Sequence, residues 1–217
     1  MMSMTKGRTV PISKTVAVVT HGIGNIRSLT NALDYLNYKV EHISSLNDIG
    51  EVDAVILPGV GNFGAVMRAI EAAGLQEFLQ EYLLEDKPFL GVCVGMQVLL
   101  EGSLEAPSVP GFGAFSGSFM HLSTLDPTRV VPSIGWNHLT PTSSPASAAV
   151  LEQAYFTHSY FASKMNRDEV ISTYDWNGFK IPAHIAKGRV HGVQFHPEKG
   201  RLAGLEFIRN TLEDITI

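Results

Sequence analysis

In the first half of the chain, short apolar runs alternate with longer stretches in which apolar residues recur every three or four positions. The short runs are rich in β-branched residues or alternate between polar and apolar positions, as strands do. Strands are predicted at residues 14–20, 38–43, 53–57 and 88–92. Helices are predicted from residue 26, over residues 63–86 with an interruption near Gly74, and over residues 95–101. Strands separated by helices imply right-handed crossovers and a parallel sheet with helices on both faces.

The second half of the chain has a different texture. Its short, β-prone segments are broken by Gly, Pro, Ser and Asn and predict strands at residues 115–122, 134–139, 154–162, 169–175 and 179–186. We expect these strands to form a mixed sheet and hairpins packed on the first half. A surface loop is predicted at residues 143–149, a last buried strand at 191–196 and an amphipathic helix at 202–212. The expected fold class is therefore α/β: a single domain with a central, mostly parallel or mixed sheet, helices on both faces and a smaller β-rich region.

Composition narrows the possible classes of protein. The 217 residues are 45% apolar and 17% charged, enough for one core and one domain. Residues 1–14 lack the apolar middle of a secretory signal, so we expect a flexible leader there and a domain over residues 15–217. Sixteen Lys and Arg against 21 Asp and Glu give a net charge of −5 without a basic stripe, which argues against nucleic-acid binding. No apolar run approaches the roughly 18–20 residues that span a bilayer, so we expect a cytoplasmic protein without membrane contact.

The single cysteine, Cys93, stands in the segment FLGVCVGMQ, where an apolar strand runs into Gly-x-Cys-x-Gly and a helix begins at once. One cysteine excludes an internal disulfide and a thiolate metal cluster, and we expect neither a metal nor a cofactor. The pattern is the cysteine version of the nucleophile elbow. Such a turn exposes the sulfur at the start of a helix, which favours the thiolate, and aims the backbone N–H of Val94 at an oxyanion beside it. An inert, buried cysteine is the alternative interpretation.

Two further segments suit the same chemistry. In GVQFHPE a predicted strand delivers His196, and Glu198 follows within reach of its imidazole. A thiol nucleophile needs a base, and the base needs an acceptor that orients it, so Cys93, His196 and Glu198 form a candidate triad. The segment PGVG at residues 58–61 ends a predicted strand, and its glycines permit a twist that aims N–H groups at a carbonyl oxygen. Taken alone, His-Pro-Glu is only a turn and PGVG only a packing loop.

These motifs, in this order and spacing, resemble those of the class I (triad-type) glutamine amidotransferases, and more narrowly the glutaminase subunits of imidazole glycerol phosphate synthase. The stretches that carry the resemblance run from about residue 16 to the end and are GIGNIRS, LPGVGNFGAVM, LGVCVGMQVLLEGS, VPSIGWNHL, YFTHSYF and GVQFHPEKG. The resemblance implies that Cys93 attacks the side-chain amide of L-glutamine, that His196 transfers protons and that Glu198 orients His196. It implies binding roles for Gly59, Val60 and Val94 at the oxyanion, for Gln97 at the substrate, and for Glu105, Ser159 and Tyr160 at the amino-acid end of glutamine.

The same resemblance implies a protein partner. Ammonia would pass to a (β/α)8-barrel cyclase subunit, in a heterodimer that makes imidazole glycerol phosphate and the aminoimidazole carboxamide ribonucleotide AICAR in histidine biosynthesis. Asn25, Trp136, Asn137 and Lys199 match the face that docks on the barrel, although a tryptophan in a β-rich region is more often core. Because a free glutaminase would waste glutamine, we expect low activity until the partner reshapes the peptide between Gly59 and Val60.

The chain also departs from this subfamily near the docking face. It has Thr20-His21 where Asp-Tyr is usual and Gly200 where Ser is usual. These departures leave open a glutaminase subunit that serves another amidotransferase, such as one that amidates sugars in surface-polysaccharide synthesis. A catalytically silent binding or regulatory subunit is a third interpretation. The bare triad also fits a cysteine protease or a γ-glutamyl hydrolase, against which the PGVG and GWN segments argue.

Overall fold

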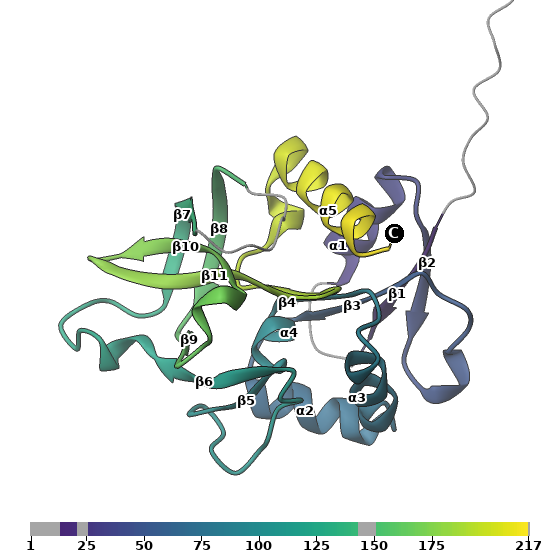
Figure 1. Cartoon of the computed structure of the whole chain (residues 1–217), viewed down its shortest axis with the longest axis horizontal. Coiled ribbons are helices and arrows are strands. Elements are labelled where there is room, and N and C mark those ends of the chain that lie inside the picture. Colours follow the sequence, from purple (N-terminus) through teal and green to yellow (C-terminus); the bar gives the residue numbers. More distant parts are fainter. Residues whose placement is uncertain (1–13, 21–25, 143–150, 217) are drawn as a thin grey trace, which may run out of the picture.

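Nine strands from the described part of the chain form one sheet at the centre of the protein (Figure 1). The computed structural model describes residues 14–20, 26–142 and 151–216. The first half of the chain supplies four parallel strands, and one strand from near the C-terminus joins them. In spatial order they are β2 (Lys39–Ile43), β1 (Thr15–Val19), β3 (Ala54–Gly59), β4 (Phe89–Cys93) and β12 (Val190–Val193). The predicted strands of the first half are confirmed.

The second half continues this same sheet through antiparallel strands. In spatial order after β12 they are β11 (Phe179–Lys187), β10 (Val170–Trp176), β7 (Ser133–Pro141) and β8 (Gln153–His158). The central mixed sheet of the expected fold class is confirmed, but these strands do not pack on the first half as the sequence suggested; they extend its sheet, because β11 hydrogen-bonds directly to β12. Two separate sheets would leave the backbone N–H and C=O groups of β12 and β11 unpaired at open edges. Pairing the two strands satisfies these groups.

A smaller sheet forms the β-rich region. It consists of β5 (Leu100–Ser103), β6 (Phe115–His121) and β9 (Tyr160–Ser163). The strand predicted at residues 154–162 is in fact two strands, β8 and β9, which belong to different sheets and are separated at Ser159. The chain thus changes sheets at the point where the resemblance places a substrate-binding residue.

Helices cover both faces of the large sheet (Figure 1). On one face lie α1 (Ile26–Tyr35) and α5 (Arg201–Ile215), and on the other lie α2 (Phe63–Ala72) and α3 (Gln76–Leu84). The helix predicted at residues 95–101 is wrong in length, because α4 covers only Val94–Gln97. The carbonyls of Val98 and Leu99 accept hydrogen bonds from Phe112 and Phe115 instead of continuing the helix.

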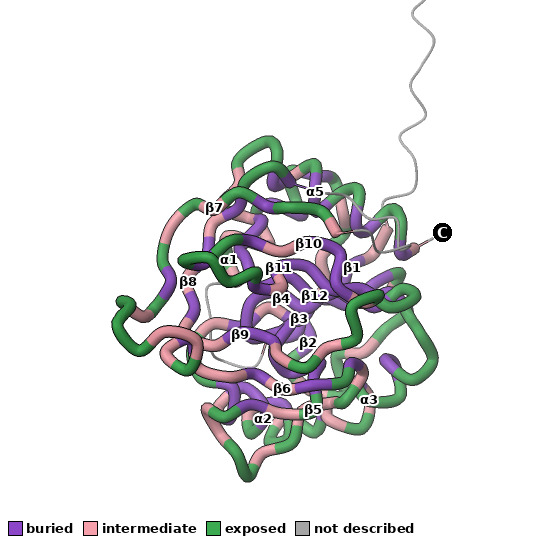
Figure 2. Tube along the Cα trace, turned by 60° about the vertical axis from the view of Figure 1, so that its left-hand side comes forward, coloured by how far each residue is buried: buried purple, intermediate pink, exposed green. Residues whose placement is uncertain are grey.

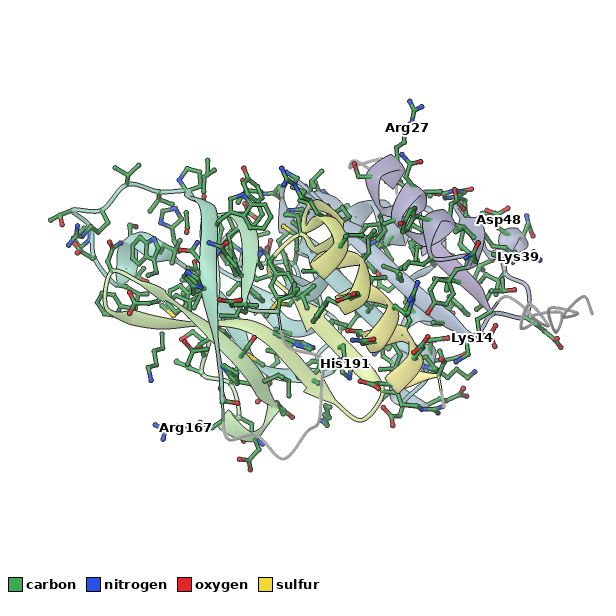
Figure 3. All side chains as sticks on the ribbon, turned by 90° about the horizontal axis from the view of Figure 1, so that it is seen from above. Lys14, Arg27, Lys39, Asp48, Arg167 and His191 are labelled. Carbon is green, nitrogen blue, oxygen red and sulfur yellow. The ribbon has the colours of Figure 1, made fainter. Side chains whose placement is uncertain are left out.

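Apolar burial is concentrated in the sheet. Figure 2 shows the central strands buried and the outer sides of the helices exposed. Leu57, Phe89 and Leu90 are fully buried, and each such side chain stabilises the fold by about 1.5–3 kcal/mol. Charged side chains such as those of Arg27 and Arg167 project outward at the periphery (Figure 3).

The predicted leader falls almost entirely outside the described residues, as do His21, Asn25 and the predicted loop at 143–149. Lys14 is described, and its carbonyl accepts a hydrogen bond from the backbone N–H of Lys39 at 3.0 Å. The boundary between leader and domain near residue 15 stays a prediction. Within the described ranges, no helix combines the length and apolarity that a bilayer crossing requires.

Candidate active site

Cys93, the last residue of β4, has a backbone conformation that residues with side chains rarely adopt. Its φ is 57° and its ψ is −109°, and conformations of this kind cost about 1–3 kcal/mol and cluster at functional sites. The helix α4 starts directly after it, at Val94. The cysteine is only 4% exposed, yet it lines a cavity of about 280 Å³. The strained turn therefore presents the sulfur to a cavity at the carboxyl end of the sheet, the geometry expected of a nucleophile elbow.

Glycines make this turn possible because backbone packs on backbone around it. A Cβ atom on Gly95 would lie 1.8 Å from the carbonyl oxygen of Leu57, and one on Gly91 would lie 2.4 Å from the carbonyl oxygen of Gly95. On Gly59, the Cβ would lie 2.8 Å from the Cβ of Val94. Any larger residue at these positions would separate β3, β4 and α4. The pattern Gly-x-Cys-x-Gly is thus a requirement of packing as well as of chemistry.

His196 reaches the elbow because it follows β12, the strand beside β4. Its backbone N–H donates to the carbonyl of Tyr155 on β8 at 3.0 Å, which holds the histidine at the sheet edge. The 3₁₀ turn η4 (Pro197–Lys199) then brings Glu198 back toward the ring. Nδ1 of His196 donates to Oε1 of Glu198 at 2.9 Å, and the two side chains are only 5% and 9% exposed. The histidine is therefore oriented by a buried carboxylate, as a general base requires.

The electrostatics of the site favour a protonated imidazole. Burial lowers the pKa of His196, but the nearby Cys93 sulfur and the Glu198 carboxylate raise it more, to about 10. Nε2 of His196 is buried and has no hydrogen-bond partner of regular geometry among the described residues. Nε2 is therefore available to a substrate bound beside the sulfur. An imidazolium beside a thiolate is the resting state of an activated cysteine nucleophile.

The cavity collects residues from segments far apart in the sequence. It is lined by Val60, Gly61, Cys93, Val94, Gln97, Glu105, Pro132, Thr157, His158, Ser159, Tyr160 and His196. Of the residues that the sequence assigned to catalysis and substrate binding, only Gly59 and Glu198 do not line it. Both line an adjacent cavity of about 100 Å³, whose walls share Val60, Thr157 and His196 with the first. The structure thus brings all the predicted catalytic and substrate-binding residues to one place.

Glu105 forms part of the cavity wall and is fixed by the start of α2. Its Oε2 accepts a hydrogen bond from the backbone N–H of Phe63, the first residue of that helix, at 2.7 Å. The Asn62 side chain accepts from the N–H of Ala65 at 3.1 Å and caps the same helix. A helix N-terminus stabilises a negative charge. The half-buried Glu105 carboxylate is therefore held in place at the cavity, where it suits the ammonium group of an amino acid.

Sequence reasoning missed Gln194, which contacts the sulfur. The residue is fully buried, and its Nε2 donates to Sγ of Cys93 at 3.7 Å. Its Oε1 accepts from Nε2 of Gln97 at 3.3 Å. One signal could have found it: side chains two apart on an extended chain share a face, so Gln194 faces the same way as His196.

His158 is a second residue without a predicted role. Its Nδ1 donates to the carbonyl of Tyr160 at 2.8 Å, and its Nε2 accepts from the hydroxyl of Tyr174 at 2.8 Å. Burial lowers the pKa of His158 to about 4, so the ring is neutral near pH 7. The histidine fixes the backbone at Ser159 and Tyr160, where β8 gives way to β9. Nothing in the sequence distinguishes it from an ordinary strand residue.

Two of the residues assigned to a docking face lie together on one tyrosine. Trp136 on β7 packs edge-on against the ring of Tyr155, with centroids 5.7 Å apart. Nζ of Lys199 lies 4.3 Å from the centre of the same ring. Trp136 is 48% exposed, so the alternative of a core tryptophan is wrong. Asn137, the next residue of β7, is half-buried and pairs with Ala154.

Metal ligands do not gather at this site. The described part of the chain contains no group of three or more His, Cys, Asp or Glu that could hold a metal ion. The cavity offers instead a sulfur, a paired imidazole, buried amides, a carboxylate and backbone groups. Such a set can attack a carbonyl carbon, stabilise an oxyanion and transfer protons.

Comparisons with known proteins agree with this chemistry. The family model "Glutamine amidotransferase class-I" matches residues 17–215. The imidazole glycerol phosphate synthase subunit HisH of Methanothermobacter thermautotrophicus is 39% identical over 202 residues, which are 92% of this chain and 98% of that protein. The HisH subunit of Oceanobacillus iheyensis is 38% identical over 203 residues, 92% of this chain and 99% of that protein.

A longer relative and a solved structure complete the comparison. The imidazole glycerol phosphate synthase hisHF of Schizosaccharomyces pombe is 37% identical over 202 residues, 89% of this chain but only 37% of that protein. A crystal structure of a glutamine amidotransferase superposes with a TM-score of 0.72 at 19% identity, over 93% of this chain and 99% of that chain. This last likeness concerns the fold alone.

Proposed function

Because the chain belongs to the class I glutamine amidotransferase family, we propose that it is the glutaminase subunit of an imidazole glycerol phosphate synthase. It hydrolyses L-glutamine to glutamate and ammonia and passes the ammonia to a cyclase subunit. The product of the assembled enzyme would be imidazole glycerol phosphate, for histidine biosynthesis. The single observation that carries the proposal is the elbow at Cys93. Beside it, His196 is hydrogen-bonded to Glu198, and Cys93 and His196 line one cavity large enough for an amino acid.

The first half of the reaction splits the amide. The Cys93 thiolate attacks the side-chain carbonyl carbon of glutamine, and the negative charge moves to the carbonyl oxygen. Backbone N–H groups at Val94 and in the loop after Gly59 stabilise that oxyanion. The His196 imidazolium gives its proton to the amide nitrogen as the C–N bond breaks, and ammonia leaves. A γ-glutamyl thioester then remains on Cys93.

The second half regenerates the enzyme. Neutral His196 takes a proton from water, and the resulting hydroxide attacks the thioester carbon. The C–S bond breaks, glutamate leaves, and the thiolate and imidazolium are restored. Glu198 holds the ring in place throughout and stabilises its positive charge. Glu105 and the backbone at Ser159 and Tyr160 bind the amino-acid end of glutamine and so place its amide at the sulfur.

The partner would dock beside the smaller cavity. Lys199 lines that cavity together with Gly59, Val60, His196 and Glu198, so ammonia released at the sulfur would meet the docking face there. The exposed Trp136 stands next to Lys199 on the ring of Tyr155 and would form an aromatic anchor of the interface. In the fungal and plant relatives named hisHF, the matched region forms about a third of a longer chain. A fused arrangement of that kind supports a cyclase as the partner.

Glutamate release from glutamine, measured with and without a cyclase subunit and its nucleotide ligand, tests the proposal. We expect slow release by the chain alone and release stimulated by the partner. Cys93→Ala is the control and should remove the stimulated activity. Stimulation that survives this substitution, or no stimulation at all, would refute the proposal.

The comparisons do not favour another amidotransferase as the acceptor of the ammonia. The relatives named above all carry the name of imidazole glycerol phosphate synthase, and none favours a sugar amidotransferase. Failure of the gene to rescue a histidine auxotroph would revive that alternative. We also propose a cytoplasmic location, because a catalytic thiol is maintained reduced there.

A further inference from the structure

Gln194 is a buried polar residue in an apolar setting. Its neighbours Val193 and Phe195 are fully buried, and Phe195 packs on Phe207 of α5 with ring centroids 5.3 Å apart. Leucine or methionine would fill the same volume. A buried amide is costly unless its polar atoms are hydrogen-bonded. The hydrogen-bond partners of the amide side chain are Cys93 and Gln97, which points to a role in the reaction.

Sheet register places Gln194 beside Cys93. In the parallel pair of β12 and β4, Val193 is the partner of Val92. One step further along both strands, Gln194 stands opposite Cys93. Its backbone N–H donates to the carbonyl of Ala183 at 2.9 Å, beyond the last residue of β12, so this position is held on β11 as well. The direction of the side chain therefore follows from the sheet and requires no contact with a substrate.

The amide side chain of Gln194 donates one hydrogen bond and accepts another. Its Nε2 donates to Sγ of Cys93 at 3.7 Å, a length suited to a sulfur acceptor, and its Oε1 accepts from Nε2 of Gln97 at 3.3 Å. An N–H donor stabilises a thiolate more than a thiol, because hydrogen bonds to charged groups are the stronger ones. The second contact fixes the rotamer of Gln97, which lines the cavity.

We propose that Gln194 is a further catalytic residue, which donates a hydrogen bond to the Cys93 thiolate and, through Gln97, joins the nucleophile to the glutamine-binding wall. This inference rests on the proposed function for the role of Cys93. His196 stabilises the same thiolate by its positive charge, whereas Gln194 does so by a neutral donor that keeps its proton during the reaction. Gln194 would thus hold the sulfur in place while the imidazole proton leaves with ammonia.

Alkylation of the free thiol tests the donor without any substrate. Cys93 is the only cysteine in the chain, so incorporation of iodoacetamide, followed by intact-mass spectrometry across pH, reports this sulfur alone. We expect Gln194→Leu to move the midpoint of the alkylation profile upward by about one pH unit. In the complex with the cyclase subunit, we expect its kcat for glutamine to fall about tenfold.

Companion variants separate the two contacts and guard against misfolding. Gln194→Glu has nearly the same shape, keeps an acceptor for Gln97 and replaces the donor by a negative charge, so it should also shift the midpoint upward. Gln97→Leu should leave the midpoint within about 0.3 pH units and raise KM for glutamine about tenfold. Thr211→Val on α5 removes another buried polar group, one without a hydrogen-bond partner among the described residues, and should change nothing.

A wild-type alkylation profile in both Gln194 variants would overturn the inference. That outcome is distinct from failure of the proposed function. If the wild-type protein and its partner released no glutamate, yet Gln194→Leu still shifted the midpoint, the glutaminase proposal would fail and the hydrogen bond would stand. Comparable thermal unfolding of Gln194→Leu and Thr211→Val establishes that the shift is local.

Discussion

Substitution of Gly95 by alanine tests the idea that backbone packing holds the elbow in place. The added methyl carbon would lie 1.8 Å from the carbonyl oxygen of Leu57 and 2.9 Å from its carbonyl carbon. Both neighbours are backbone atoms, so no side chain can rotate away. Relief of the contact requires β3 and α4 to separate by more than about 1 Å. Overpacking of this kind costs about 3 kcal/mol, which lowers Tm by about 10 °C in a chain of this length.

The effect on activity should exceed the effect on folding. A displacement of about 1 Å at a nucleophile can cost about 100-fold in rate, and Cys93 stands two residues before the substituted position. Partner-stimulated glutamate release and a thermal melt measure the two effects. Gly102→Ala on β5 is the matched control, because its Cβ would meet no atom closer than the carbonyl oxygen of Val109 at 3.8 Å. Gly95→Ala with wild-type rate and wild-type Tm would refute the packing argument.

Four other outcomes follow from the described geometry. Cys93→Ala should lower glutamate release at least about 1,000-fold with little change in Tm, and residual activity above a tenth would contradict its role as nucleophile. Glu198→Gln removes the carboxylate that raises the pKa of His196, so the alkaline limb of the pH profile of kcat should move to lower pH; an unmoved limb would speak against this pair. Burial lowers the pKa of His191 to about 4, so the unfolded state takes up a proton first and stability should fall between pH 6.5 and 4, by up to about 3 kcal/mol from this group. Urea unfolding of His191→Gln should show a smaller loss over that range, and an equal loss would count against the assignment. Trp136→Ala should weaken cyclase binding about 30-fold at unchanged Tm, and titration of the two subunits with an equal Kd would remove Trp136 from the interface.

Local patterns along the chain were sufficient to predict the parallel half of the sheet and the meeting of the candidate triad residues at its edge. Apolar runs of strand length have one stable placement when helices separate them, namely side by side with their carboxyl ends together. Cys93 and His196 each end such a run, so their meeting could be predicted although 103 positions separate them in the sequence. The glycines at 91 and 95 indicated the tight turn, because only glycine tolerates the backbone contacts found at these positions.

Local patterns could not predict features that depend on contacts with segments far away in the sequence. The end of α4 at Gln97 depends on hydrogen bonds from Phe112 and Phe115, and the break at Ser159 depends on β9 pairing with β6. Neither interaction leaves a mark in the local sequence. The same holds for the exposure of Trp136, because a tryptophan in a β-rich region is more often core.

The sequence by itself therefore determined the candidate reacting groups, their order and the sheet edge at which they meet, because periodicity, glycine sterics and side-chain chemistry are local properties. Only the tertiary structure decided which other side chains and backbone groups surround the candidate reacting groups at that edge. It placed Gln194 against the sulfur, His158 behind the backbone of Tyr160 and Glu105 at the start of α2. These contacts join segments far apart in the chain, and which polar atoms meet there is set by the registers and packing of the whole fold.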